Sequence, residues 1–561
     1  MILFFPPVSR FFRITSPNLG QIVIACSVGF ASVIWIDIVK VLRFKKVKAA
    51  ALVLLAFVCG TSSVHSQNLI LNQIAEADQN TEFRKFYATN NYSLAWTSKE
   101  DRQELINFIR GIELDGLDPE NYNLSYLTAS ACISPDSVAL DIALTRSFLE
   151  LAHDLYEGRV NPDKLFPGDW DACTTPADYG ELLVCALNGQ GICETLNMLK
   201  PMDNGYEGLK YMLSNFRAMQ QKGSLPMIPF GDPIEPGDTD ERIAEIRMRL
   251  SMLGLLIPEF DNEDIYYDSA LLPAILQFQV LHGLTADGTI GRKTQQAMQI
   301  SIGDYISMII VNLEKYRWHQ SRLLDRSIKI NIPSFDLRLS ENERTELKMK
   351  VIIGRDERPT PVINSAITAI IINPTWTVPP TIFKEDVLPA VKADVTYLQR
   401  HNMKVLNSRG KEINADSIDW SLVTERNFRY HIQQDAGPTN PLGRIKFFIP
   451  NHHSVYLHDT NMPSLFASNE RAVSSGCIRI ESPMALVRLL APVSGWTEKM
   501  VRDQIDSGET RIVLIKDPLP VHTTYFTAYV DNDQMYVVKD LYSYDKIILN
   551  ALRAARDPLL R

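Results

Sequence analysis

The sequence has little positive charge and few cysteines, and each scarcity narrows the functions open to the chain. Its 57 lysines and arginines are outnumbered by 66 aspartates and glutamates, which gives a formal net charge of −9. Nucleic-acid binding needs a basic surface, so this balance argues against a nucleic-acid partner. Only seven of the 561 residues are cysteines, and Cys477 is the only one after Cys193. That isolated thiol is the first candidate for reactive chemistry.

The N-terminal region carries two apolar segments. Residues 14–36 contain no charged side chain and are long enough to span a membrane. A second apolar run, 49–58, follows a basic cluster and precedes small residues, with Val64 and Ser66 at the −3 and −1 positions of a signal-cleavage site. We expect region 1–66 to hold a secretory signal, with the natural start near the basic cluster. A retained membrane anchor at the first segment is the alternative.

In both cases the bulk of the chain is expected in the periplasm or cell envelope, where disulfides form. Cys132, Cys173, Cys185 and Cys193 lie in one region and allow two disulfides in three connectivities. We expect at least one of these bonds, and reduced buried thiols are the alternative. Cys477 is then left over, as a catalytic thiol in an oxidising compartment needs to be.

The periodicity of apolar residues predicts helices in the first half of the chain. Residues 67–230 show apolar side chains at three- and four-residue steps, without a pair of carboxylates or a Cys/His cluster of catalytic spacing. We therefore expect a helical scaffold domain there. A proline- and glycine-rich break comes next, and then residues 238–300 predict a small three-helix module. An amphipathic helix within 301–326 is expected to link this module to the C-terminal part of the chain.

After this helix the period changes to two, which indicates strands. Short, β-branched segments separated by turns predict a mostly β domain over 327–517. It carries a long insertion with helical content at about 380–441, and insertions of that length in compact domains are usually functional. Residues 518–561 are expected to form a C-terminal extension of further strands and a last helix. The predicted fold class is thus a multidomain α+β protein.

The segment from His458 to Glu481, HDTNMPSLFASNERAVSSGCIRIE, is the most informative part of the chain. Cys477 follows Ser-Ser-Gly, and His458 ends a strand-like SVYLH nineteen positions earlier. A thiol needs a base or a cation nearby because the thiolate is the nucleophile. A histidine at a strand end can meet a cysteine at the start of another element. Gly476 allows a tight turn there, and the amides around it can bind an oxyanion.

Two simpler interpretations compete with a nucleophilic thiol. Cys477 could be an unreactive buried side chain, which is the more common fate of a lone cysteine. Alternatively, His452, His453 and His458 could form a zinc site with Cys477. The zinc interpretation is disfavoured because adjacent residues of a strand, such as His452 and His453, point to opposite faces.

The segment resembles the catalytic motif of the YkuD-type L,D-transpeptidases, a histidine followed by Ser/Thr-x-Gly-Cys-x-Arg. Ser475, before the glycine, matches the large, scaffold-bearing YcbB-like branch of that family. The family often has asparagine four positions after the cysteine, whereas this chain has Glu481. Residues 278–298, FQVLHGLTADGTIGRKTQQAM, are similar to the peptidoglycan-binding type 1 module. A packing unit that has lost sugar binding is the alternative for that module.

The resemblance implies a role for each residue of the motif. Cys477 would be the nucleophile and His458 the general base, then acid. Support of the loop and of the oxyanion would fall to Gly476, Ser475, Ser474 and Arg479. The insertion would be a mobile cap over the site. A run N-P-x-W-x-V-P before it matches the same branch, and the residues expected to line the substrate are Trp376, Asn373 and Asp459.

The sequence therefore predicts an L,D-transpeptidase that joins peptidoglycan stem peptides through 3→3 cross-links, without metal or cofactor. An L,D-carboxypeptidase that hydrolyses the same acyl-enzyme is one alternative, and a non-catalytic wall-binding protein is another. The expected partners are peptidoglycan peptides and glycan, with other wall-synthesis proteins as further candidates. Contact with the membrane is expected only through the N-terminal segment.

Overall fold

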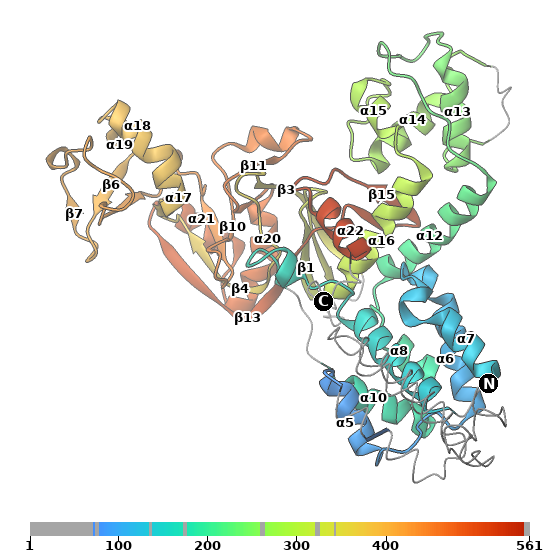
Figure 1. The fold of residues 1–561 in the computed structure, drawn as a ribbon. Coiled ribbons are helices and arrows are strands. Elements are labelled where there is room, and N and C mark those ends of the chain that lie inside the picture. Colours follow the sequence, from blue (N-terminus) through green and yellow to red (C-terminus); the bar gives the residue numbers. More distant parts are fainter. Residues whose placement is uncertain are drawn as a thin grey trace, which may run out of the picture. The chain divides into compact units, whose positions relative to one another are not determined.

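A computed structural model describes residues 71–72, 78–133, 137–171, 177–257, 264–319, 326–341 and 344–554 (Figure 1). The N-terminal apolar segments, Val64, Ser66 and Cys173 lie outside these ranges. Among the helices described, none is both long enough and apolar enough to cross a bilayer. The chain divides into two compact units. The first contains Met1–Ile112, Asp118–His153 and Pro176–Leu199, and the second contains Glu113–Leu117, Asp154–Thr175 and Lys200–Arg561.

The first unit is helical. Its helices include α5 (Thr81–Thr89), α6 (Lys99–Gly111), α7 (Leu124–Ile133), α8 (Val138–Tyr156), α10 (Tyr179–Cys185) and α11 (Ile192–Asn197). A buried carboxylate joins α8 to α5 and to the segment after it: Asp141 on α8 accepts hydrogen bonds from the Tyr87 hydroxyl at 2.6 Å and from the Trp96 amide at 2.8 Å. These bonds satisfy a charge that would otherwise be costly to bury.

The free cysteines limit the disulfides that the four upstream cysteines can form. Cys132 and Cys185 carry free thiols, so the four upstream cysteines do not form two disulfides. The prediction of at least one disulfide in this region would now be met only by a bond between Cys173 and Cys193. Cys173 lies outside the described residues, so that bond stays a prediction.

The second unit begins with a set of helices. They are α9 (Pro162–Leu165), α12 (Asn204–Lys222), α13 (Arg242–Met252), α14 (Leu271–Leu281), α15 (Arg292–Ala297) and α16 (Ile302–Trp318). Ile246, Leu250, Phe278 and Ile290 form part of the core between α13, α14 and α15. Gln279 is buried there, and its side chain donates to the carbonyl of Thr289 and accepts from the amide of Gly288. The turn before α15 is thereby fixed to α14.

A nine-stranded mixed sheet forms the body of the second unit, in the order β11-β3-β12-β10-β9-β4-β13-β1-β2. An additional pairing of β2 with β3 closes the sheet on itself. The strands are β1 (Arg326–Asn331), β2 (Asp336–Glu341), β3 (Arg344–Gly354), β4 (Asn364–Ile372), β9 (Ile445–Phe448), β10 (Leu457–His458), β11 (Ala472–Ser474), β12 (Ile478–Ile480) and β13 (Arg511–Thr524). The predicted multidomain α+β class, with helices first and a mostly β domain after them, is confirmed.

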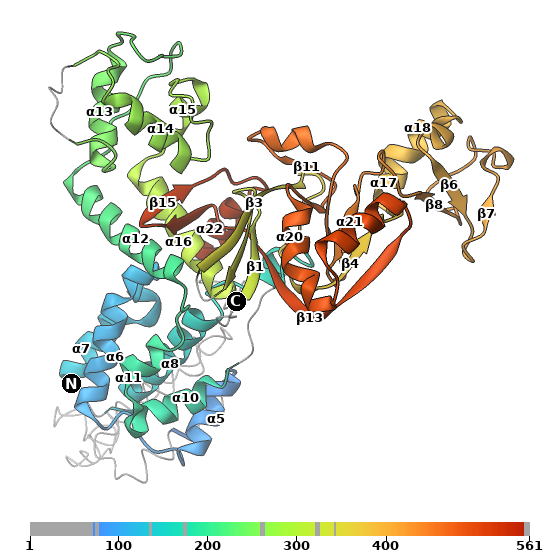
Figure 2. The ribbon, with the colours of Figure 1, turned by 180° about the vertical axis from the view of Figure 1, so that it is seen from behind.

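The main sheet continues past the boundary expected at residue 517. β13 pairs with β4 on both sides of a bulge and then runs parallel to β1 as far as Thr524. A hairpin comes next, β14 (Ala528–Asp531) with β15 (Gln534–Val537), and then α22 (Tyr544–Ala554), which lies beside α16 (Figures 1 and 2). Ile548 and Ala551 of α22 belong to the same core as α20 (Pro483–Leu490) and α21 (Glu498–Ser507). The C-terminal residues thus complete the β domain.

The insertion between β4 and β9 is a small folded body with its own core. Its four-stranded sheet has the order β5-β8-β6-β7, and buried side chains such as Phe383, Leu398 and Trp420 pack beside it. Its elements are β5 (Trp376–Thr377), α17 (Pro380–Ile382), a π-turn (Phe383–Val387), α18 (Leu388–Ala393), α19 (Tyr397–Arg400), β6 (Met403–Leu406), β7 (Glu412–Ile413) and β8 (His431–Gln434). The polar loops expected here are therefore partly strands.

Buried charges on α16 hold several segments of the second unit together. Glu314 accepts hydrogen bonds from the amides of Arg159 and Val160 at 2.5 and 2.9 Å and from the Arg317 guanidinium at 2.7 Å. Arg317 also donates to the backbone carbonyl of Asp115. Both charged side chains are at most 1% exposed. The donors around Glu314 all point at its carboxylate. Loss of that negative charge is therefore expected to destabilise the network.

Replacing Glu314 with Gln should therefore lower the free energy of unfolding by about 3–5 kcal/mol, the usual cost of breaking a buried ion pair. The new amide would direct N–H groups at donors and would remove the carboxylate that pairs with Arg317. Urea unfolding followed by tryptophan fluorescence measures the change, since Trp318 is buried nearby.

The control is the exposed pair between Lys293 and Glu470, whose side chains are 70% and 69% exposed. Lys293→Ala should cost less than ~1 kcal/mol. Equal effects of the two substitutions would show that the buried network contributes no more than a surface contact.

Candidate active site

The pairing of β10 with β12 determines which side chains can meet at the candidate site. The two strands run parallel, with Leu457 beside Ile478 and His458 beside Arg479. The Ile478 amide donates to the carbonyl of Tyr456 at 3.1 Å, which continues this register by one residue. Side chains of a strand alternate between its faces. Leu457 and Ile478 point into the hydrophobic core, so their neighbours in sequence point the other way.

The opposite face collects Tyr456, His458, Cys477 and Arg479. On the other side of β10, β9 runs antiparallel and places Lys446 beside His458 on this same face. The structure thus brings the predicted nucleophile and the predicted base to one face of two adjacent strands. Cys477 is level with Tyr456, and His458 lies two residues further along the neighbouring strand. Cys477 and His458 share no direct hydrogen bond in this described part of the sheet. The hydrogen-bond acceptor for the thiol Sγ is the carbonyl of Ser454, at 4.0 Å.

The loop before Cys477 is closed by a buried serine. The Ser474 hydroxyl donates to the carbonyl of Cys477 at 2.6 Å and accepts from the Gly476 amide at 3.2 Å. Gly476 has a φ of +104°, and a Cβ there would lie 3.3 Å from the carbonyl oxygen of Pro359. Backbone conformation and space both favour glycine at this position. The Ser474 hydroxyl therefore closes the loop before Cys477.

A second layer of hydrogen bonds supports this loop from behind. The Thr360 hydroxyl donates to the carbonyl of Gly476 and accepts from the Gly354 amide, both at 2.8 Å. The Tyr542 hydroxyl in turn accepts from the Thr360 amide at 3.2 Å and donates to the Gly354 carbonyl at 2.7 Å. The segment before α22, for which the sequence suggested no role, thus supports the cysteine loop through Thr360.

His458 is buried and held in one orientation. Its Nδ1 lies 2.5 Å from the carbonyl oxygen of Asp459, a geometry in which Nδ1–H donates and Nε2 keeps its lone pair. Burial, and secondarily the positive charge of Arg479, lower the pKa of His458 to about 3. The imidazole is therefore neutral near neutral pH and can accept a proton.

Opposing effects act on the thiol of Cys477. Burial raises its pKa above the ordinary value, whereas hydrogen bonding from Tyr456 and the positive charges of Lys446 and Arg479 lower it. Burial dominates, so the pKa of Cys477 is raised overall. The site thus holds a protonated thiol near a neutral imidazole.

Tyr456 and Lys446 are parts of the site that the motif did not reveal. The Lys446 ammonium lies 3.6 Å from the centroid of the Tyr456 ring, a cation–π contact, and the Tyr456 and His458 rings are 5.6 Å apart. Trp376, expected to line the substrate, interacts with the Tyr456 side chain through a hydrogen bond that lowers the pKa of the tyrosine, although burial raises that pKa more. The alternation within SVYLH and RIKFF could have indicated both residues.

Arg358 connects the cysteine loop with the base of the insertion. Its guanidinium is 7% exposed and donates to the Ser475 hydroxyl at 2.9 Å. It also forms ion pairs with Glu385 and with Asp386, the latter at 2.9 Å. Nothing in the sequence around Arg358 signals this role, because its partners lie 27, 28 and 117 residues away. Ser475, which was expected to support the loop, thus contacts the side chain of Arg358.

Three residues named in the sequence analysis form hydrogen bonds to backbone groups. Asn373 is buried, and its amide donates to the carbonyls of Gln504 and Ile505 at 2.9 and 3.1 Å. It therefore holds the end of α21 and does not line an open substrate site, which corrects the expectation. The Asp459 carboxylate accepts from the amides of Arg444 and Thr460 and fixes the backbone next to His458. Glu481, where the family often has asparagine, accepts from the Lys350 amide of β3 at 3.1 Å.

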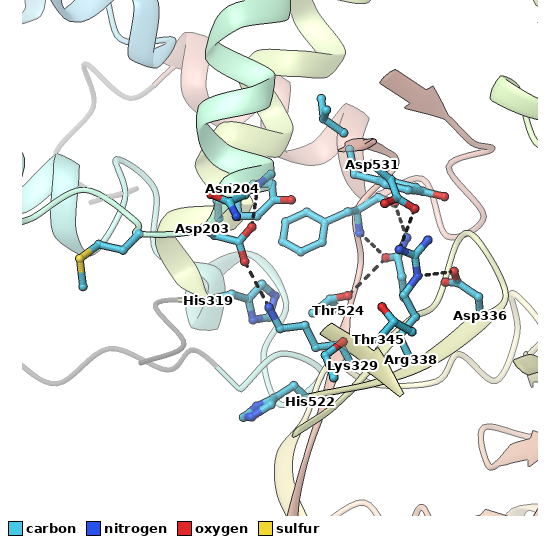
Figure 3. Close-up of a pocket in the computed structure, with 18 of the residues that line it drawn as sticks. Asp203, Asn204, His319, Lys329, Asp336, Arg338, Thr345, His522, Thr524 and Asp531 are labelled. Atoms are coloured by element: carbon cyan, nitrogen blue, oxygen red, sulfur yellow. Dashed lines mark hydrogen bonds and ion pairs between the residues drawn. The ribbon is translucent and has the colours of Figure 1, made fainter. Parts of the chain in front are cut away.

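A pocket of about 340 Å³ lies elsewhere in the second unit and shares no residue with the cysteine site (Figure 3). Its charges are paired with one another: Lys329 lies 3.2 Å from Asp203, and Arg338 lies 2.7 Å from Asp531. Asp336 lies 3.2 Å from the same Arg338, so three carboxylates share two cations in this pocket.

Three family models match the chain. A scaffold domain matches residues 81–213, a peptidoglycan binding domain matches 239–298, and an L,D-transpeptidase catalytic domain of the YkuD family matches 325–501. A provisionally named L,D-transpeptidase of Haemophilus influenzae is 31% identical over 296 residues, which cover 52% of this chain. The match spans 59% of that relative's length.

Two solved structures are more distant. An L,D-transpeptidase from Mycobacterium smegmatis is 13% identical over 35% of this chain and 58% of its own, with a TM-score of 0.17. An L,D-transpeptidase fragment from Xylanimonas cellulosilytica is 13% identical over 53% of this chain and 98% of its own, with a TM-score of 0.16. The family matches and the motif residues agree on one conclusion. The chain carries a YkuD-type L,D-transpeptidase catalytic domain over residues 325–501, behind segments that match a scaffold domain and a peptidoglycan binding domain.

Proposed function

We propose that the protein forms 3→3 cross-links between peptidoglycan stem peptides through an acyl-enzyme on Cys477. The observation that carries the proposal is the shared face of β10 and β12, where a protonated thiol and a neutral histidine lie among Tyr456, Lys446 and Arg479. The match of residues 239–298 to a peptidoglycan binding domain supports the same substrate and a working place in the cell envelope.

The first half of the reaction transfers the acyl group of the donor to the enzyme. His458 Nε2 takes the thiol proton while Sγ attacks the carbonyl carbon of the diamino acid, in its amide bond to the terminal D-alanine of a tetrapeptide stem. The C–N bond then breaks, and His458 returns the proton to the leaving amine of D-alanine. In the second half, the side-chain amine of another stem attacks the thioester, gives its proton to His458, and releases the thiolate, which is reprotonated.

The groups proposed to bind the oxyanion differ in part from those first expected, the amides around Gly476. The Gly476 amide is already used by Ser474, so the donors proposed for the tetrahedral intermediate are the Cys477 amide and the Tyr456 hydroxyl. Arg479 is the group proposed to meet the carboxylate of the stem peptide. Its Nε is buried without a hydrogen-bond partner among the described residues, and burial lowers its pKa. An incoming carboxylate would satisfy both the hydrogen bond and the charge.

Replacing Cys477 with Ala should abolish cross-link formation and leave the fold intact, because the nucleophile is lost from a half-buried position. Purified protein is incubated with tetrapeptide-bearing muropeptides, and dimers and released D-alanine are measured by mass spectrometry. Release of D-alanine without dimers in the wild type would indicate hydrolysis in place of cross-linking.

Cys185→Ala is the matched control, since Cys185 carries an exposed free thiol in the first unit. It should cross-link at the wild-type rate. Dimers formed by the Cys477→Ala protein would remove Cys477 from the mechanism.

The rate of alkylation of Cys477 should rise with pH and reach its midpoint above that of an ordinary cysteine, because burial raises its pKa. Lys446→Met removes a cation that lowers this pKa, so the midpoint should move to still higher pH. His458, with a pKa of about 3, should add no second transition between pH 5 and 8. Iodoacetamide labelling read at the Cys477 peptide by mass spectrometry gives the profile.

Lys516→Met removes an exposed positive charge from β13 in the same domain and should leave the profile unchanged. A shift to lower pH in the Lys446→Met protein would contradict the electrostatic argument.

Arg358→Met should lower kcat/KM by roughly 10–100-fold, the size of effect that a small misplacement of a catalytic group produces. The substitution disconnects the Ser475 hydroxyl and the two carboxylates of the insertion at once. Ser475→Ala removes only the loop contact, and the pair Glu385→Gln with Asp386→Asn removes only the contacts to the insertion. Each should reproduce part of the loss, measured as initial rates on the same muropeptides.

Arg355→Met is the control for a nearby arginine, since Arg355 forms a longer, solvent-exposed pair with Glu357 at 3.5 Å. Its rate should match the wild type. An unchanged rate in the Arg358→Met protein would leave that arginine with a purely structural role.

A further inference from the structure

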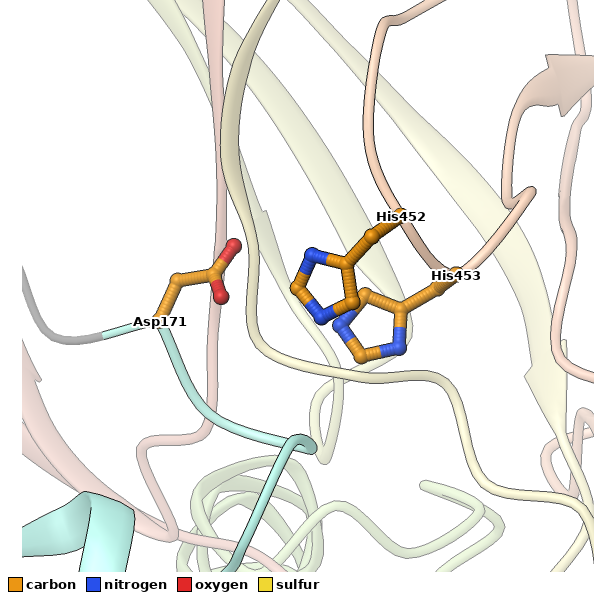
Figure 4. A group of neighbouring side chains, drawn as sticks. All are labelled: Asp171, His452 and His453. Carbon is orange, nitrogen blue, oxygen red and sulfur yellow. The ribbon is translucent and has the colours of Figure 1, made fainter.

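Asp171, His452 and His453 gather at one point of the second unit, away from the residues assigned to catalysis. One potential ligand atom from each of the three lies within 4.8 Å of the others. In Figure 4 the Asp171 carboxylate faces the two imidazole rings from a different stretch of chain. Asp171 directly follows Trp170, whereas the histidines lie in the loop between β9 and β10. Asp171 is separated from the two histidines by 281 and 282 positions in the sequence, yet the three residues form one cluster.

The two histidines can act together because they do not lie in a strand. Residues 452 and 453 form a turn, and Ser454 after them has a φ of +58°. Their ring centroids are 3.8 Å apart, with 38° between the ring planes. The sequence-based argument that adjacent histidines point to opposite faces is therefore wrong here. It assumed a strand that begins only later, at Leu457.

Hydrogen bonds hold both arms of the cluster in place. On one side, the Asp171 amide donates to the carbonyl of Val362 at 2.8 Å, and the Asn364 amide donates to the carbonyl of Asp171 at 2.7 Å. On the other side, the Asn451 side chain donates to the carbonyls of Ile449 and Val455 at 2.7 Å each. These bonds use backbone groups of the two segments, so they leave the carboxylate and rings available for another partner.

One ring nitrogen has no partner of its own. His453 Nε2 is buried and makes no hydrogen bond to any described residue. A buried polar atom without a partner is costly in a folded protein, and a bound ion removes that cost. Two imidazole nitrogens and one carboxylate oxygen are a ligand set that zinc and related ions prefer, whereas magnesium and calcium select oxygen ligands.

We propose that Asp171, His452 and His453 bind a divalent transition-metal ion of the Zn²⁺ class, with water completing the coordination. The site is distinct from the zinc site considered from the sequence, because Cys477 and His458 take no part in it. The histidine loop continues into Ser454, whose carbonyl is the acceptor for the Cys477 thiol. A bound ion would fasten this loop to the segment that carries Asp171. The proposal does not depend on the transpeptidase activity.

Zinc binding to the full-length, untagged protein tests the site. The Cys477→Ala background is used throughout, so that the reactive thiol cannot compete for the metal. After removal of metal with a chelator, isothermal titration with ZnCl₂ should give a site lost in the double variant His452→Ala/His453→Ala. Asp171→Ala should weaken that site by at least ~10-fold, since even changes outside the ligand shell cost 10–100-fold.

His431→Ala is the control, because His431 is exposed on β8, in the insertion. It should bind zinc as the parent does. Circular dichroism of the metal-free variants should match the parent, as expected for ligands that are exposed or half-buried.

Substitution of Zn²⁺ by Co²⁺ distinguishes this site from metal bound by the remaining cysteines. A nitrogen and oxygen site should give visible d–d bands without the ultraviolet charge-transfer band of a thiolate ligand, and these bands should disappear in the double histidine variant. Zinc affinity that survives in that variant, bands that depend on thiolate, or an absence of binding in the parent would each overturn the proposal.

Discussion

The candidate active site depends on the register between two short parallel strands. β10 and β12 contribute only a few residues each, yet their pairing decides that Tyr456, His458, Cys477 and Arg479 share one face. Because side chains alternate along a strand, a slip of one residue would turn this whole set toward the core. The loop hydrogen bonds of Ser474 and Thr360 serve the same end, since they fix where β12 begins.

The sequence predicted the parts of the site that a motif can carry. The Cys477 and His458 pair, the glycine turn and the mostly β domain all follow from local patterns. Tyr456 and Lys446 were recoverable from strand alternation, because they occupy the same phase as His458. Arg358 was not recoverable, since its role depends on partners brought close only by the tertiary fold.

Errors of the sequence-based predictions have identifiable physical causes. Asn373 was assigned to the substrate because of its neighbours in a motif, whereas its amide satisfies the carbonyls at the end of α21. The pair of histidines was assigned to a strand, whereas it lies in a turn. The position of Asn373 is set by hydrogen bonds to a distant segment, whereas the histidine turn is stabilised by local bonds of the Asn451 side chain. The boundary expected at 517 falls inside β13 because the bulged strand finds partners on both sides of it.

The protonation state of the resting thiol affects how the protein withstands oxidants. Peroxide and disulfides react with thiolates far more readily than with thiols, and exposure adds to the damage. Because burial keeps Cys477 protonated and half-covered, the nucleophile is shielded while no substrate is bound. In the proposed mechanism, the neutral His458 takes this proton only when a carbonyl is in place to capture the sulfur. On that proposal, burial lowers the resting reactivity of the thiol and lengthens the working life of the protein in the presence of oxidants.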